Sequence, residues 1–187
     1  IWMQDIRRPE PGPNDVLIKI RKTAICGTDM HIYNWDEWAA QTIPVPMAVG
    51  HEYVGIVEAI GSEVQGVQPG DRVSGEGHLT CGHCRNCRAG KPHLCPNTVG
   101  IGVQRNGAFA EFVVVPQHIL YELPTDVSYE AGAMTEPLSV ALHAVKQAES
   151  ARDGGAAPTP PGKDRALVVG CGVIGLLAIQ SARVGGS

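Results

Sequence analysis

Four cysteines, Cys81, Cys84, Cys87 and Cys95, are spaced C-x2-C-x2-C-x7-C in a polar segment that contains glycine. Thiolates this close together suit a tetrahedral ion, and four sulfur ligands with no open position are typical of structural zinc. Two disulfides are an alternative, but they would need an oxidising compartment, which we do not expect here. An iron–sulfur cluster also takes four cysteines, though usually at other spacings. We therefore predict a zinc-binding lobe over about residues 78–97.

The composition is that of an ordinary globular protein, with 187 residues, 43% apolar and 18% charged. This length allows one substantial core, or one domain and a fragment of another. The net charge of -4 and the lack of a basic run give no reason to expect a nucleic-acid partner. No apolar stretch approaches the roughly 20 residues that span a bilayer, so no membrane partner is expected. Six cysteines, at least five of them beside metal-binding neighbours, favour the reducing cytoplasm.

The first part of the chain is predicted to be mostly β. Short apolar segments at 16–22 and 53–60 read as strands, a turn at 70–73 leads into a third, and 107–115 reads as a fourth. Glycine turns separate these segments and Pro116 ends the last. Short strands at this spacing predict a partly open barrel.

The pattern changes after Pro124. Residues 128–131 resemble a helix start, and apolar side chains recur at helical spacing from Glu136 to Ala148. Residues 150–164 are rich in glycine, proline and alanine and read as a flexible loop. A short strand at 166–169 and a helix at 176–184 are predicted to follow. The fold class is therefore mixed α/β, and we expect a piece of a longer polypeptide because the last unit has barely begun.

A second group of candidate metal ligands lies before the cysteine lobe. Cys26 begins the run CGTDMH, and His51 and Glu52 follow about 25 residues later. One thiolate, one imidazole and one carboxylate leave a position open for water or substrate, as catalytic zinc requires. The alternative interpretation is a buried cysteine and a hydrogen-bonded core histidine. Thr28 and His31, just beyond the thiol, favour the metal site.

A glycine motif lies at the predicted strand-to-helix junction, with Gly170, Gly172 and Gly175 spaced G-x-G-x-x-G and Ile174 before the last glycine. Such glycines allow a tight turn and the close approach of a pyrophosphate to the helix N-terminus. The motif therefore predicts NAD binding, with a glycine turn that serves only packing as the alternative. Cys171, inside the motif, is predicted to face the core.

Several other residues are expected to have structural roles. Trp35 and Trp38 are predicted to pack on a core, with a place in the wall of a substrate site as the alternative. The remaining histidines are expected to be exposed or to pack: His78, His83, His93 and His143.

Three runs carry a resemblance to a known family: 21–38 (RKTAICGTDMHIYNWDEW), 44–55, which includes PVPM and GHEYVG, and 70–78 (GDRVSGEGH). They resemble the zinc-dependent medium-chain dehydrogenase/reductase family. Residues 1 to about 115 are similar to a branch that oxidises a hydroxy amino acid. Residues 136–145 are more similar to the sorbitol and butanediol dehydrogenase branches, and the loop 150–164 looks longer than is usual in the first branch.

The resemblance implies a domain organisation and a reaction. A GroES-like catalytic domain would occupy 1–150, a loop 151–164, and the first βα unit of an incomplete Rossmann domain 165–187. The reaction would be oxidation of a secondary alcohol, a small-molecule substrate, with zinc and NAD as cofactors. Full-length relatives would be cytoplasmic homotetramers. An inactive zinc-binding fragment of such an enzyme is the alternative from a different functional class.

The resemblance also implies roles for single residues. Cys26, His51 and Glu52 would surround catalytic zinc, and Thr28 and His31 would form a proton relay. Glu136 would be a carboxylate near the catalytic metal that assists the relay.

Overall fold

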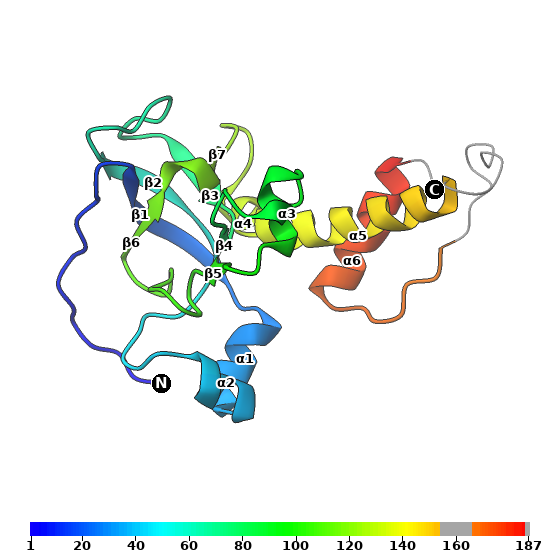
Figure 1. Ribbon diagram of the computed structural model, residues 1–187, viewed down its shortest axis with the longest axis horizontal. Coiled ribbons are helices and arrows are strands. Elements are labelled where there is room, and N and C mark those ends of the chain that lie inside the picture. Colours follow the sequence, from blue (N-terminus) through cyan, green and yellow to red (C-terminus); the bar gives the residue numbers. More distant parts are fainter. Residues whose placement is uncertain (154–165, 186–187) are drawn as a thin grey trace. The chain divides into compact units, whose positions relative to one another are not determined.

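The computed structural model describes residues 1–153 and 166–185. The chain divides into two compact units, Ile1–Met134 and a second unit that begins at Thr135, and each is described by itself. In Figure 1 the first unit carries all the labelled strands, and the second consists of two long helices.

The first unit is built on a five-stranded antiparallel sheet with the order β6-β1-β2-β3-β7. Its strands are β1 (Asp15–Ala24), β2 (Glu52–Ile60), β3 (Arg72–Gly75), β6 (Phe112–Pro116) and β7 (Leu120–Glu122). The first three predicted strands are confirmed. A short 3-10 turn, Gln117–Ile119, joins β6 to β7.

The predicted strand at 107–115 is only partly correct, because β6 begins at Phe112. The preceding residues bond instead to the segment before β2. Gly107, Ala108 and Phe109 donate their backbone N–H groups to carbonyls of residues 48–50 at 2.7–2.9 Å. These bonds satisfy the backbone of 107–109 outside the main sheet.

The main core lies on one face of this sheet. After Asp15, strand β1 has three consecutive buried residues, Val16, Leu17 and Ile18. Because successive side chains of a strand point to opposite faces, both faces of β1 are covered here. The strand is central in the sheet, paired with β2 and β6. The buried members of this core are Val16, Ile18, Tyr53, Val57, Val73, Ile101, Ala108, Val113, Val115 and Ile119. Burial of this apolar surface is the main favourable contribution to folding of the unit.

Two short helices follow β1 and lead towards β2. Helix α1 (Gly27–Asn34) ends at Trp35, which has left-handed backbone angles, and Asp36 caps α2 (Glu37–Thr42). A small core of Ile32, Ala39 and Ile43 holds the pair together. Helix α4 (Tyr129–Ala133) packs on the other side, where Ala133 contacts Val54 and Leu123. The predicted helix start at 128–131 is confirmed, since the Ser128 side chain caps α4.

The cysteine-rich lobe has little regular structure of its own. Its base is a two-residue pairing of β4 (His78–Leu79) with β5 (Val99–Gly100). Between these strands lie the single-turn helix α3 (Arg85–Arg88) and a 3-10 turn, Pro92–Leu94. Such a lobe has no large apolar core, so it needs another source of stability.

The second unit consists of α5 (Thr135–Asp153) and α6 (Val173–Gly185), which contact each other. Both predicted helices are confirmed and extend further than expected. The predicted linker falls largely on residues 154–165, which lie outside the described residues. The predicted strand at 166–169 is wrong, because 166–171 has no regular secondary structure. A strand needs a hydrogen-bonded neighbour, and within 166–185 none is present.

Cys171 is exposed, so the prediction that it faces a core is wrong. Within the described residues no sheet lies beneath the glycine motif, so there is no core for this side chain to face. Leu167 and Val169, just before the motif, are each 90% exposed.

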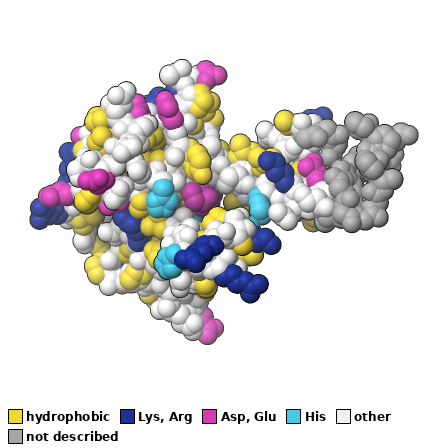
Figure 2. Space-filling model, turned by 45° about the horizontal axis from the view of Figure 1, so that its top comes forward, with side chains coloured by type: hydrophobic (Ala, Val, Ile, Leu, Met, Phe, Trp, Pro, Cys, Tyr) yellow, Lys and Arg dark blue, Asp and Glu magenta, His cyan; other side chains and the backbone are white. Residues whose placement is uncertain are grey.

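None of the described helices is long and apolar enough to cross a bilayer. Figure 2 shows acidic and basic side chains together on the visible face of the protein. The presence of both signs agrees with the small net charge of -4.

Candidate metal centres and proton relay

Sheet pairing brings Cys26, His51 and Glu52 together. Ala24, at the end of β1, pairs with Glu52, at the start of β2. Cys26 therefore lies two residues past this pair, and His51 one residue before it. Their sulfur, nitrogen and carboxylate atoms all lie within 4.8 Å of one another. The structure thus assembles three residues that were singled out from the sequence.

Glycine at position 50 is required by the path of the chain into His51. Its φ angle is +92°, and a Cβ atom there would lie 2.3 Å from the Phe109 ring. Because the 107–109 segment bonds to residues 48–50, the backbone before His51 is held from two sides. This support fixes the position of the imidazole relative to the sheet.

Burial disfavours charge on the two ligands from β2. His51 is 8% exposed and Glu52 5%. Burial lowers the pKa of His51; the Asp29 charge opposes this shift, and His78 adds to it. Burial raises the pKa of Glu52, the Asp29 charge raises it further, and a hydrogen bond with Cys26 lowers it. A divalent cation among these groups would favour the neutral imidazole and the anionic thiolate and carboxylate.

Asp29 is a functional residue that the sequence reasoning missed. Its Oδ2 accepts the backbone N–H of Cys26 at 2.8 Å, and its Oδ1 lies 4.0 Å from Nδ1 of His51. These two facing atoms, Asp29 Oδ1 and His51 Nδ1, are buried, are too far apart to bond to each other, and have no hydrogen-bond partner in the structure. A histidine that binds a metal through one nitrogen usually donates its other N–H to a carboxylate or carbonyl. The signal in the sequence was an acid three residues after Cys26, where a capping box places it.

The two relay candidates lie on α1. The hydroxyl oxygen of Thr28 is 3.8 Å from the Cys26 sulfur, so it borders the metal cluster. His31 lies in the last turn, and its Nδ1 contacts Asp36 Oδ2 at 2.5 Å. Thr28, His31, Asp36 and Trp38 line a hollow of about 300 Å³. The hollow is therefore lined both by Thr28, which lies next to Cys26, and by the histidine.

The prediction that both tryptophans pack on a core is wrong. Trp35 is 48% and Trp38 40% exposed. Trp35 lies in the left-handed turn between α1 and α2, which projects it away from the small core of Ile32, Ala39 and Ile43. Trp38 lines the hollow instead, with its ring edge-on to His31 at a centroid distance of 6.0 Å.

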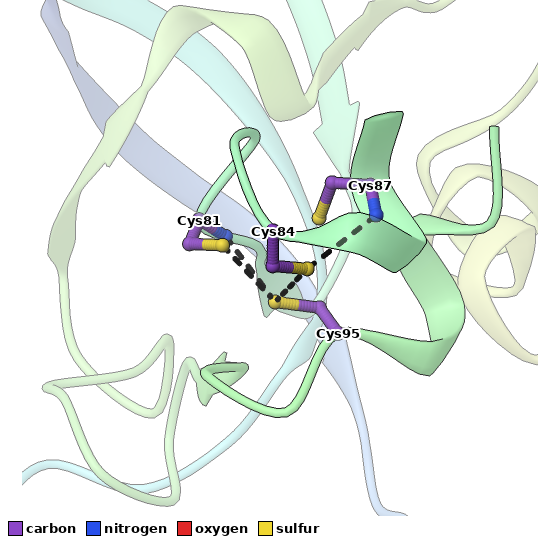
Figure 3. Close-up of side chains that lie close together, drawn as sticks. All are labelled: Cys81, Cys84, Cys87 and Cys95. Carbon is purple, nitrogen blue, oxygen red and sulfur yellow. Dashed lines mark hydrogen bonds between the residues drawn. The ribbon is translucent and has the colours of Figure 1, made fainter. Parts of the chain in front are cut away.

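The four cysteines of the lobe converge on one point (Figure 3). The Cys95 sulfur lies 3.6 Å from that of Cys81 and 4.0 Å from that of Cys84. In a regular tetrahedron with zinc–sulfur distances of about 2.3 Å, sulfurs lie about 3.8 Å apart. All six cysteines of the chain are free thiols here. The lobe therefore fits a single tetrahedral ion better than disulfides, and better than a cluster whose cysteines bind more than one iron.

Backbone N–H groups point at these sulfurs, as they do around bound thiolates. Cys81 N–H donates to the Cys95 sulfur and Cys87 N–H to the Cys84 sulfur. Hydrogen bonds from the backbone of residues 83 and 84 lower the pKa of Cys81 to about 6. Desolvation and the neighbouring thiols raise the pKa of Cys87 to about 11. A cation is what would allow all four sulfurs to be anionic at neutral pH.

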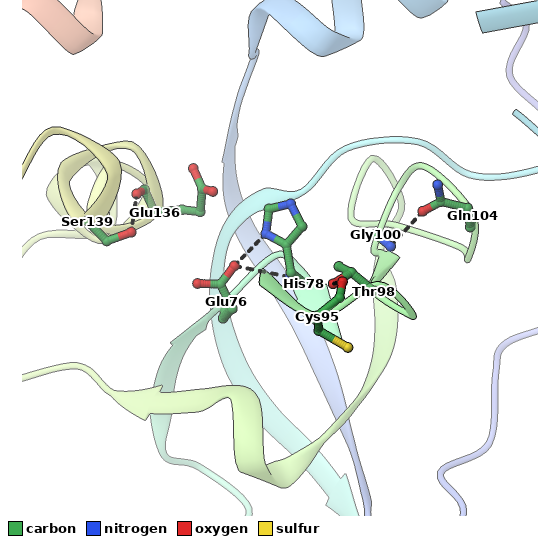
Figure 4. Close-up of polar contacts among 8 residues, drawn as sticks. All are labelled: Glu76, His78, Cys95, Thr98, Gly100, Gln104, Glu136 and Ser139. Carbon is green, nitrogen blue, oxygen red and sulfur yellow. Dashed lines mark hydrogen bonds and ion pairs between the residues drawn. The ribbon is translucent and has the colours of Figure 1, made fainter. Parts of the chain in front are cut away.

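The histidines around the lobe are exposed, as predicted. His78 makes two contacts with Glu76 (Figure 4). Glu76 Oε1 accepts the backbone N–H of His78 at 3.1 Å and lies 2.7 Å from Nδ1 of its ring. The His78 hydrogen bond is the main reason that the pKa of Glu76 is lowered. His83 and His93 remain on the surface of the lobe, and His143 on the surface of α5.

The remaining predicted site residues belong to the second unit. Glu136 lies in the first turn of α5, where its carbonyl accepts the Ser139 hydroxyl at 2.7 Å (Figure 4). Gly170 has a φ of +107°, and a Cβ on Gly175 would lie 2.0 Å from the Gly170 carbonyl oxygen. The motif thus forms the tight turn into α6 that the sequence predicted. A role for Glu136 in the relay, and for Gly170, Gly172, Ile174 and Gly175 in cofactor binding, stays a prediction.

The sequence matches the model of the alcohol dehydrogenase GroES-like domain over residues 12–125. It is 56% identical over 183 residues to L-threonine 3-dehydrogenase of Aeromonas salmonicida, a match that covers 98% of this chain and 50% of the relative. The chain therefore spans about half the length of the curated relatives it matches.

Solved structures agree with this match. The structure is similar to galactitol-1-phosphate dehydrogenase from Escherichia coli, with a TM-score of 0.83 and 32% identity over 99% of this chain and 49% of that one. It is also similar to a cobalt- and zinc-bound thermostable alcohol dehydrogenase from Pyrobaculum aerophilum, with a TM-score of 0.80 and 29% identity over 97% of this chain and 52% of that one.

Proposed function

Because the chain belongs to the alcohol dehydrogenase family that carries a GroES-like domain, we propose that it forms the catalytic, zinc-binding part of an NAD-linked L-threonine 3-dehydrogenase. The observation that carries this proposal is the convergence of Cys26, His51 and Glu52 beside the Thr28 hydroxyl. The reaction is oxidation of the threonine hydroxyl to a ketone, which gives 2-amino-3-oxobutanoate.

The donor sets fit two zinc ions of different kinds. Cys26, His51 and Glu52 offer three ligands and leave a position for substrate, whereas four cysteines close the site in the lobe. Zinc at the first site would supply a Lewis acid that makes the substrate hydroxyl more acidic. The lobe site would supply stability and take no part in the reaction.

The protein's own residues then handle the proton. Thr28 is close enough to the candidate metal ligands to accept the hydroxyl proton of a substrate bound there while it gives up its own hydroxyl proton. His31, which lines the same hollow, receives the proton that Thr28 gives up and passes it to water, as a general base does. The two electrons leave as a hydride, for which NAD is the acceptor.

We assign the cofactor to the glycine motif and a supporting role to Glu136. The turn at Gly170–Gly175 leads directly into the first turn of α6, the local arrangement that accepts a pyrophosphate in dinucleotide-binding folds. On this assignment, residues 1–150 form the catalytic domain and 165–187 the first βα unit of an NAD-binding domain. The resemblance to the family supports a cytoplasmic homotetramer, and the free thiols agree with a reducing compartment.

The test is NAD reduction by the zinc-loaded protein with L-threonine. Turnover should disappear in Cys26→Ser together with one equivalent of zinc, and should persist in Tyr121→Phe, which alters an exposed side chain on β7 outside both clusters. Full activity of Cys26→Ser would overturn the catalytic assignment.

A second candidate is oxidation of a polyol or 2,3-butanediol. The similarity of residues 136–145 to those branches favours it. Parallel assays with 2,3-butanediol and sorbitol separate the two candidates. Calorimetric titration with NAD separates both from a zinc-binding domain without activity, which would show no binding.

A further inference from the structure

The turn between α1 and α2 brings Asp36 back beside His31. Trp35 has a φ of +49°, which turns the chain sharply after α1. Its backbone N–H bonds to the Ile32 carbonyl at 3.2 Å, and that of Asp36 to the His31 carbonyl at 3.4 Å. A side chain five residues after the histidine is thereby placed against its ring.

The carboxylate of Asp36 makes two separate contacts. Its Oδ1 accepts the Ala39 N–H at 2.9 Å and so caps α2, while its Oδ2 contacts Nδ1 of His31 at 2.5 Å. Two hydrogen bonds lower the pKa of Asp36: the bond from the Ala39 N–H has the larger effect, and the bond with His31 has the smaller one. The carboxylate is therefore ionised at neutral pH and can only accept hydrogen bonds. Consequently Nδ1 of His31 must carry the proton, and Nε2 is left as the acceptor of a neutral ring.

The ring is also held from the side. Trp38 meets the imidazole edge-on, with an interplanar angle of 71°. Asp36 and Trp38 line the same hollow as Thr28 and His31. One carboxylate at the start of α2 and one indole two residues later thus restrict an otherwise exposed histidine.

We propose that Asp36 is a positioning residue that fixes His31 in the Nδ1–H tautomer, so that Nε2 accepts the proton in the relay. The role in turnover rests on the proposed function. As Thr28 takes the substrate's hydroxyl proton, its own hydroxyl proton passes to Nε2, while Nδ1–H stays bonded to Asp36. The resulting imidazolium then releases the Nε2 proton to water, so Thr28 and His31 both return to their starting states.

The first test is the tautomer itself, which does not depend on activity. Ring-nitrogen chemical shifts of the ¹⁵N-labelled, zinc-loaded protein are measured, with His31→Gln used to assign the signals. The neutral ring should show a protonated Nδ1 and an unprotonated Nε2. In Asp36→Asn the side chain still caps α2, since asparagine is an equally good N-cap, but its amide can donate to Nδ1. The population should therefore shift to the Nε2–H tautomer.

Glu37→Gln is the matched control, because it removes one negative charge from the next residue, which contacts Gln41 instead of His31. It should leave the tautomer unchanged. An Nε2–H ring in the parent protein, or the same tautomer in the parent and in Asp36→Asn, overturns the proposal.

The second test asks whether Asp36 acts through His31. Asp36→Asn should lower kcat about tenfold or more with little change in KM, as expected for a disturbed proton transfer. In a His31→Gln background the same change should have almost no further effect. Equal losses in both backgrounds contradict the proposal. If the parent protein does not oxidise threonine, the proposed function fails, and the tautomer still decides what Asp36 does.

Discussion

Asp29 Oδ1 lies 4.0 Å from Nδ1 of His51, and both side chains are buried. We predict that Asp29→Asn weakens zinc binding at the first site about 10- to 100-fold, because an amide orients the imidazole less firmly than a carboxylate. The asparagine oxygen can still accept the Cys26 N–H, so α1 should remain capped. Competition with a zinc chelator measures the affinity. Asp126→Asn, an exposed change of the same kind, should behave like the parent. Parent-like zinc affinity in Asp29→Asn would argue against this contact.

The buried Cys95 gives a prediction for the lobe, since its sulfur lies within 4.0 Å of the sulfurs of both Cys81 and Cys84. Cys95→Ser should reduce bound zinc from two equivalents to one and lower the Tm by more than about 5 °C, because metal binding and folding of the lobe are coupled. Elemental analysis and calorimetry measure the two effects. Cys171→Ser should change neither quantity. A Cys95→Ser protein that keeps both zinc ions would show that the lobe does not use this thiol.

Arg72 fastens the segment that leads from β7 to α4. Its guanidinium donates to the carbonyls of Pro124, Thr125 and Val127 and lies 4.5 Å from the centre of the Tyr129 ring. Lysine cannot make these contacts together, so Arg72→Lys should lower the free energy of unfolding by about 2–3 kcal/mol. Urea denaturation measures the loss. Arg21→Lys, an exposed change on β1, should cost less than about 0.5 kcal/mol. Equal denaturation midpoints for the two variants would mean that these Arg72 contacts contribute little to stability.

Glu76 gives a prediction about acid stability. Its hydrogen bond with His78 lowers its pKa below the ordinary value of 4.5 in the folded protein. A lowered pKa means that the folded state favours the charged form, so the contribution is present above about pH 4.5 and is lost as the pH falls further. The carboxylate is partly exposed, so the contribution should be below about 1 kcal/mol. Denaturation at pH 7 and pH 4 should show a larger loss of stability from Glu76→Gln at pH 7 than at pH 4. A difference that is unchanged at both pH values would contradict the assignment.

Much of the first unit could be predicted from the sequence because its signals are local. Apolar runs bounded by glycine and proline gave three strands, and cysteine spacing gave the lobe. The Cys26–His51–Glu52 cluster was also predicted, although its members meet only through the pairing of Ala24 with Glu52. That pairing depends on register, which the sequence does not display directly.

The errors have a common physical origin in tertiary context. Residues 107–109 read as strand, but their hydrogen bonds go to 48–50, outside the main sheet. Trp35 and Trp38 were predicted to be core residues. The left-handed turn at Trp35 instead leaves both side chains partly exposed. Asp29 and Asp36 were not singled out from the sequence, because only the folded backbone shows that each faces a histidine.

The two candidate metal sites differ in how much chain a metal would have to order. The Ala24–Glu52 pair belongs to a long antiparallel ladder, so the loop that separates Cys26 from His51 is already closed before any ion arrives. The strands at the base of the lobe pair at two positions, His78 with Gly100 and Leu79 with Val99. The free energy of ion binding there must offset most of the entropy that is lost when the loop closes. Zinc should therefore enter the first site as a ligand enters a rigid receptor, with small heat-capacity change, and the second as a folding reaction.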